Sequence, residues 1–127
     1  MSDIEIEVLI VEDDKAMADL IQEELEDEGY QTRVAYNGGD AIKAVQDSLP
    51  DVVVLDINMP GKDGIETLSE IVNLNANLPV ILHTAYSAYK ENYMTWAAVE
   101  YVVKASDFKD LKNAIARLAK QAAHEKS

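Results

Sequence analysis

The sequence predicts an α/β domain of the doubly wound type, in which five helices cover the two faces of a five-stranded parallel sheet. Short apolar runs of strand length alternate with longer segments whose apolar residues recur at helical spacing, and the alternation repeats five times. Alternating units of this kind form a parallel sheet with right-handed crossovers. The length of 127 residues fits one domain, so we expect a single domain over 1–127, with its core at about 6–121 and a frayed tail at 122–127.

The predicted strands are apolar runs bounded by turn residues. The run from Val52 to Leu55 holds four apolar, mostly β-branched residues after Pro50 and Asp51, which is typical of a central strand buried on both faces. The other strands are predicted at Ile6–Val11, Gln31–Tyr36, Pro79–Leu82 and Val99–Val103.

The predicted helices carry apolar residues three and four positions apart. They are expected at 15–28, 41–49, 65–72, roughly 88–98, and from Asp107 onward. Gly29 follows the first helix as a C-cap, and Asp107 is expected to cap the last one.

Charge and composition exclude several functions. The formal net charge is −13, and residues 1–30 hold twelve acidic residues and one Lys. Such a chain repels nucleic acid, so we expect no direct nucleic-acid binding. The acidic residues at 23–28 form either the solvated face of the first helix or a partner surface. No cysteine, signal-peptide pattern or membrane-length apolar run is present, which predicts a cytoplasmic protein with no membrane contact.

Polar residues follow several of the predicted strands. In a parallel sheet the carboxyl ends of the strands share one rim, so these side chains are expected to converge. The residues are Glu12, Asp13, Asp14, Asp56, Thr84 and Lys104.

Clustered carboxylates repel one another unless a cation joins them, and Mg²⁺ prefers oxygen ligands of this kind. An ionised Asp56 beside Mg²⁺ and Lys104 is equipped to attack phosphorus, and Thr84 supplies a further hydrogen-bond donor. The alternative is a structural ion cluster in which Lys104 bridges carboxylates and Thr84 is a turn residue.

These segments resemble the receiver domain of the two-component response regulator family, in order and spacing over nearly the whole chain. The matching segments are Val11-Glu12-Asp13-Asp14, Leu55-Asp56-Ile57-Asn58-Met59-Pro60-Gly61-Lys62-Asp63-Gly64, Thr84-Ala85 and Lys104. The resemblance implies a flavodoxin-like fold with strand order 2-1-3-4-5.

The resemblance also implies a function. Asp56 would accept a phosphoryl group from a histidine kinase or phosphotransfer protein, and Thr84 and Lys104 would contact the phosphoryl oxygens. The Mg²⁺ ion would be held by Asp13, Asp56 and the Asn58 carbonyl, with Glu12 acting through water. Asp14 lies one place beyond the acidic pair of the family.

The resemblance implies a switch as well. Tyr101 stands where the family carries an aromatic residue that moves inward when Thr84 is drawn to the phosphoryl group; the alternative is an ordinary half-buried strand residue. A bulky Tyr86 could shield the acyl phosphate from water. The family usually follows its lysine with Pro, often through a cis bond, whereas Ala105 follows Lys104 here, so we expect a trans bond.

Most aromatic residues gather late in the chain, around the predicted helix at 88–98, the last strand and the start of the last helix. They are Tyr86, Tyr89, Tyr93, Trp96, Tyr101 and Phe108. Exposed aromatic residues anchor interfaces, so this face is predicted to bind a downstream protein or a second copy in a homodimer, although simple helix packing is the alternative.

We therefore expect a stand-alone response regulator with self-phosphorylation and autodephosphorylation chemistry but no separate substrate. One alternative is a receiver-shaped protein-binding module that is not regulated by phosphorylation. Another is a metal-dependent phosphatase, but such an enzyme usually has a second acid two residues after its nucleophile, where this chain has Asn58.

Overall fold

The computed structural model describes residues 5–56, 64–85 and 100–126. The strands are β1 (Glu7–Val11), β2 (Gln31–Ala35), β3 (Val52–Leu55), β4 (Val80–Thr84) and β5 (Glu100–Val103). The helices are α1 (Lys15–Asp27), α2 (Gly38–Asp47), α3 (Gly64–Leu74) and α4 (Lys109–Lys126). The helix predicted at 88–98 lies outside the described residues.

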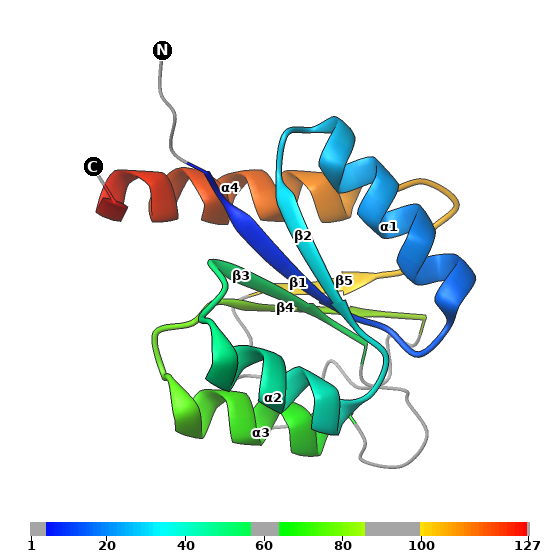
Figure 1. The fold of residues 1–127 in the computed structure, drawn as a ribbon. Coiled ribbons are helices and arrows are strands. Elements are labelled where there is room, and N and C mark those ends of the chain that lie inside the picture. Colours follow the sequence, from blue (N-terminus) through cyan, green and yellow to red (C-terminus); the bar gives the residue numbers. More distant parts are fainter. Residues whose placement is uncertain (1–4, 57–63, 86–99, 127) are drawn as a thin grey trace.

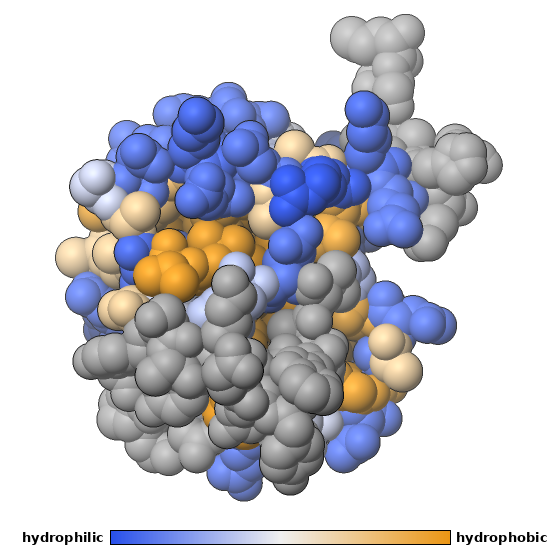
Figure 2. All heavy atoms as spheres, turned by 180° about the vertical axis from the view of Figure 1, so that it is seen from behind, coloured by the Kyte–Doolittle hydropathy of each residue, from blue (hydrophilic) through white to orange (hydrophobic). Residues whose placement is uncertain are grey.

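The five strands form one parallel sheet in the order β2-β1-β3-β4-β5, which confirms the predicted fold class and strand order. The sheet is a middle layer, with α1 and α4 on one face and α2 and α3 on the other (Figure 1). The upper part of the molecule, where α1 and α4 lie, is covered mainly by hydrophilic residues when seen from behind (Figure 2).

Alternation along the strands divides the core into two clusters, because successive side chains point to opposite faces of a sheet. Leu9, Val53 and Leu82 belong to the cluster beneath α2 and α3. Ile10 and Val54 belong to the cluster beneath α1 and α4. Both faces of the central strands are therefore buried, as their continuous apolar runs predict.

The end of α1 confirms the C-cap predicted at Gly29. This glycine has φ 95°, a left-handed conformation that L side chains rarely adopt. Its N–H donates to the Glu26 carbonyl and the Tyr30 N–H donates to the Leu25 carbonyl, a Schellman arrangement that satisfies the last carbonyls of the helix.

Several helix ends differ from the sequence-based expectation by one to three residues. The second predicted helix reached Leu49, but α2 ends at Asp47 and Leu49 is exposed. The last helix, α4, extends through Lys126, and the fraying of the tail at 122–127 stays a prediction. Among the described residues, no helix combines the length and the apolar character needed to span a membrane.

The acidic segment at 23–28 is mostly exposed, as a solvated helix face would be. Part of its charge is used within the molecule: Glu24 forms an ion pair of 2.6 Å with Lys112 on α4, and Glu26 accepts a hydrogen bond from the Thr32 hydroxyl.

Candidate functional site: an acidic pocket at the carboxyl rim

The sheet brings the predicted acidic residues and lysine together at its carboxyl rim. Val11 lies beside Leu55 in the β1–β3 register, so Glu12 and Asp56 each follow their strand at the same level. The Glu12 N–H donates to Ala35, and the Asp56 N–H to Val11, which extends the strand pairing one residue further. The carboxylates are therefore positioned by the sheet itself. Both residues are almost fully buried, at 2% and 5% exposed.

Lys104 enters the pocket from the end of β5. Its N–H donates to the Thr84 carbonyl over 2.7 Å, which fixes its main chain beside β4. Its Nζ lies 2.7 Å from Glu12 Oε1 and 3.1 Å from Asp56 Oδ2, so one ammonium bridges two buried carboxylates. Burial disfavours the ammonium, but the hydrogen bond to Glu12 and the charge of Asp56 outweigh it and raise the pKa of Lys104.

Negative charge in the pocket exceeds what this single ammonium neutralises. Carboxylate oxygens of Glu12, Asp13 and Asp56 all lie within 4.8 Å of one another. Burial raises the pKa of Glu12 to about 7, with the neighbouring Asp56 adding to the shift and the hydrogen bond from Lys104 opposing it. Converging oxygen ligands with surplus negative charge fit a hard divalent cation such as Mg²⁺.

Asp14 has a different place from its two acidic neighbours. It is exposed and is the N-cap of α1: its Oδ1 accepts a hydrogen bond of 3.2 Å from the Met17 N–H. Its own N–H points back and donates to Glu12 Oε2 over 3.3 Å. Asp14 was predicted to lie with the rim carboxylates. An Asp directly before a helical pattern is, however, also the usual signal of an N-cap.

Thr84 is fully buried at the end of β4, and Tyr101 on β5 is half-buried against the core cluster beneath α2 and α3. The described residues contain no cis peptide bond, so the bond between Lys104 and Ala105 is trans, as expected. Trans geometry still brings the Lys104 ammonium onto both carboxylates. Asn58 and Tyr86 lie outside the described residues.

His83 lies one residue before the end of β4. In the structure it is buried, at 4% exposed. Burial lowers its pKa to about 4, and the positive charge of Lys104 adds to this effect while Asp56 opposes it. A neutral imidazole thus lies at the level of the pocket on the strand beside β3.

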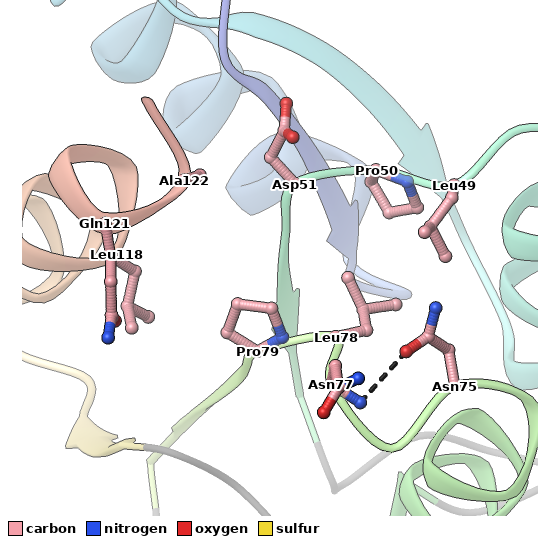
Figure 3. Close-up of a pocket in the computed structure, with 10 residues that line it drawn as sticks. All are labelled: Leu49, Pro50, Asp51, Asn75, Asn77, Leu78, Pro79, Leu118, Gln121 and Ala122. Atoms are coloured by element: carbon pink, nitrogen blue, oxygen red, sulfur yellow. Dashed lines mark hydrogen bonds between the residues drawn. The ribbon is translucent and has the colours of Figure 1, made fainter. Parts of the chain in front are cut away.

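A cavity lies at the opposite end of the strands from the acidic residues, where β3 and β4 begin. This cavity of about 840 Å³ is formed by the segments that enter β3 and β4 and by the C-terminal half of α4 (Figure 3). Its lining includes the apolar Leu78 and Leu118 and the carboxylate of Asp51, which accepts a hydrogen bond from the Glu7 N–H. It is therefore separate from the acidic pocket.

A sheet of this order with acidic residues and a lysine at its carboxyl rim defines a receiver-type signalling fold. The model of the response regulator receiver domain family matches residues 8–116, and the chain belongs to this family. Phosphorylation and Mg²⁺ binding are general features of these domains in two-component systems.

The relatives agree with this assignment. The transcriptional regulatory protein ZraR of Klebsiella oxytoca is 36% identical over 114 residues, which are 88% of this chain and 26% of the relative. ZraR of Escherichia coli K12 is 36% identical over 124 residues, which are 96% of this chain and 27% of the relative. The chain spans about a quarter of the length of these curated relatives.

Solved structures give the same result. TrrA of Thermotoga maritima, in complex with Mg²⁺ and BeF, is 41% identical with a TM-score of 0.87, covering 89% of this chain and 98% of TrrA. A CheY-like receiver domain from Methanospirillum hungatei is 25% identical with a TM-score of 0.88, covering 96% of this chain and 99% of that one.

Proposed function

We propose that this domain accepts a phosphoryl group on Asp56 from a histidine kinase or phosphotransfer protein and switches the binding of a partner or passes the group on. The observation that carries the proposal is the bridging ammonium of Lys104, 3.1 Å from a buried Asp56 carboxylate inside a cluster of three acids. The solved complex of histidine kinase ThkA with TrrA, which is 41% identical to this chain, supports this class of donor.

The chemistry follows from the residues of the pocket. A carboxylate oxygen of Asp56 attacks phosphorus, an acyl phosphate forms, and the bond from phosphorus to the donor imidazole nitrogen breaks. The leaving imidazole keeps the electron pair and later takes a proton. Lys104, whose Nζ lies 3.1 Å from Asp56, would neutralise charge on the phosphoryl oxygens, and Thr84 at the end of the neighbouring β4 would donate a hydrogen bond.

Mg²⁺ is the cofactor that this pocket fits. Asp13 and Asp56 would hold the ion directly and Glu12 through water, and the carbonyl of Asn58, outside the described residues, would supply another ligand. When bound, the ion neutralises charge on the phosphoryl oxygens during transfer. Its two positive charges would also relieve the repulsion that helps to raise the pKa of Glu12.

The output is proposed to be a change of protein contacts. When the phosphoryl group draws in the Thr84 hydroxyl, Tyr101 is expected to move further into the core, which shifts an existing two-state equilibrium. The aromatic face predicted from the sequence would carry the downstream partner or a homodimer. The chemistry is proposed to be confined to phosphorylation and autodephosphorylation of the domain, without a separate substrate.

The direct test is incubation with Mg²⁺ and acetyl phosphate, followed by intact mass spectrometry. We expect one phosphoryl adduct that disappears in Asp56→Asn and in EDTA. Asp47→Asn, which alters an exposed carboxylate at the end of α2, is the matched control and should keep the adduct. An adduct that persists in Asp56→Asn contradicts the assignment. The lack of an adduct in any variant favours a binding module that phosphorylation does not regulate.

A further inference from the structure

We propose that Asp14 is a positioning residue for the acidic pocket: its side chain caps α1 and thereby holds its main-chain N–H against the Glu12 carboxylate. The consequence for Mg²⁺ rests on the proposed function, whereas the positioning of Glu12 does not.

The two oxygens of Glu12 are held by groups from two different parts of the chain. Lys104 Nζ binds Oε1 over 2.7 Å from the end of β5. The Asp14 N–H binds Oε2 over 3.3 Å from the start of α1. A carboxylate held at both oxygens keeps one orientation, so Asp14 contributes the contact that stops Glu12 from rotating about the bond to Lys104.

The direction of this N–H depends on the Asp14 side chain. Asp14 has an extended main chain, with φ −79° and ψ 108°, and the helix begins at the next residue. Two bonds fix this junction: Oδ1 accepts from the Met17 N–H, and the carbonyl accepts from the Ala18 N–H over 2.9 Å. When an N-cap side chain is removed, the first N–H groups of the helix lose a partner and the first turn loosens. The main chain that carries the Asp14 N–H would loosen with it.

The position of Asp14 argues against a direct role as a metal ligand. The acids whose oxygens converge within 4.8 Å are Glu12, Asp13 and Asp56, while Asp14 is exposed and its side chain is turned to the helix. Its effect on the pocket should therefore depend on capping ability rather than on charge.

Two substitutions separate capping from charge. Asp14→Asn keeps a good N-cap and removes the charge, whereas Asp14→Ala removes both. Asn37→Ala is the matched control, because Asn37 caps α2 through the same type of bond, from the Asp40 N–H to Oδ1 over 2.8 Å, and is not one of the groups that hold the Glu12 carboxylate.

Two readouts are needed. The first, in metal-free protein, is the NMR signal of the Glu12 side-chain carboxyl carbon together with the Lys104 ammonium. The second is the Mg²⁺ dissociation constant from calorimetric titration. We expect Asp14→Ala to shift both NMR signals and to weaken Mg²⁺ binding about tenfold, at the low end for groups that orient metal ligands. Asp14→Asn should stay close to the wild type, and Asn37→Ala should lower thermal stability without changing either readout.

Other outcomes overturn the proposal. If Asp14→Ala lowers thermal stability but leaves the Glu12 signal unchanged, Asp14 only caps the helix. If Asp14→Asn and Asp14→Ala change the NMR signals and the Mg²⁺ dissociation constant equally, the lost charge of Asp14 is the cause, and its capping is not. If the wild type binds no Mg²⁺, the metal part of the proposed function fails, and the metal-free spectra still decide whether Asp14 positions Glu12.

Discussion

At the scale of single residues, burial beside charge decides the properties of the pocket. Glu12 and Asp56 are buried carboxylates that share one ammonium, and His83 is buried and neutral at the same level of the sheet. A charged imidazole there would face Lys104 and would compete with it for Asp56. Keeping His83 neutral leaves Lys104 as the cation that bridges the two carboxylates.

His83 should make folding sensitive to mild acid. Its folded-state pKa of about 4 lies below the ordinary value of 6.5, so the unfolded chain binds the proton more tightly. Stability from neutral His83 is fully present above about pH 6.5 and is lost as the pH falls toward 4. Relative to His83→Leu, the wild type should lose about 2 kcal/mol of unfolding free energy between pH 7.5 and pH 5.

Urea unfolding of both proteins at the two pH values measures this difference. The comparison with His83→Leu removes contributions from other groups, including Glu12, whose raised pKa acts in the opposite direction. An equal stability difference at pH 7.5 and pH 5 would show that His83 does not titrate on unfolding.

At the scale of helices and strands, some ends of the helices could be predicted from the sequence and others could not. Gly29 was predicted as a cap because its freedom at positive φ is a local property. The role of Asp14 was missed because an acidic run can be read as a ligand set or as a helix start. Leu49 fits the helical spacing of α2, yet the helix ends at Asp47. Pro50 disfavours a helical conformation in the residue before it, which is Leu49.

Gly29 and Gly39 offer a matched test of backbone conformation. Gly29→Ala places a side chain at φ 95° with open space around it, so only backbone strain opposes the change, and we expect a loss of about 1–2 kcal/mol. Gly39 lies in α2 without positive φ, so Gly39→Ala should be neutral or stabilising by up to about 1 kcal/mol. Chemical denaturation measures both. Equal changes in unfolding free energy for the two variants would contradict the left-handed conformation of Gly29.

Arg33 connects three elements at the β2 edge of the sheet. Its Nη1 donates to the Ala44 carbonyl of α2 over 3.0 Å, and its Nη2 pairs with Glu7 of β1 over 2.9 Å. We expect Arg33→Met to cost about 1–3 kcal/mol, because carbonyls and a carboxylate lose a charged partner. Arg117→Met breaks a pair in which the arginine side chain is 60% exposed, and it should cost less than about 1 kcal/mol.

Thermal and urea unfolding of the two arginine variants give the comparison. A cost for Arg33→Met no larger than that for Arg117→Met would show that the contacts of Arg33 add little to the fold.

At the scale of the whole molecule, most of the architecture could be predicted because β-α alternation, apolar runs and crossover handedness restrict the topology strongly. The convergence of Glu12, Asp56 and Lys104 could be predicted because the carboxyl ends of parallel strands share one rim. What could not be predicted is the pairing inside the pocket. Side-chain packing, which strand order does not specify, decides three features of the site. These are the pairing of Lys104 with both Glu12 and Asp56, the burial of His83, and the hydrogen bond from the Asp14 N–H to Glu12.

Asp56 is proposed to be the phosphoryl acceptor of this receiver domain. We would phosphorylate the wild type with acetyl phosphate and Mg²⁺, reduce it with borohydride, which converts the acyl phosphate of an aspartate to an alcohol, and map the product by tandem mass spectrometry. We expect a reduced side chain at Asp56 alone, dependent on Mg²⁺. Reduction at Glu12 or Asp13, or no reduction despite a phosphoryl adduct, would contradict it.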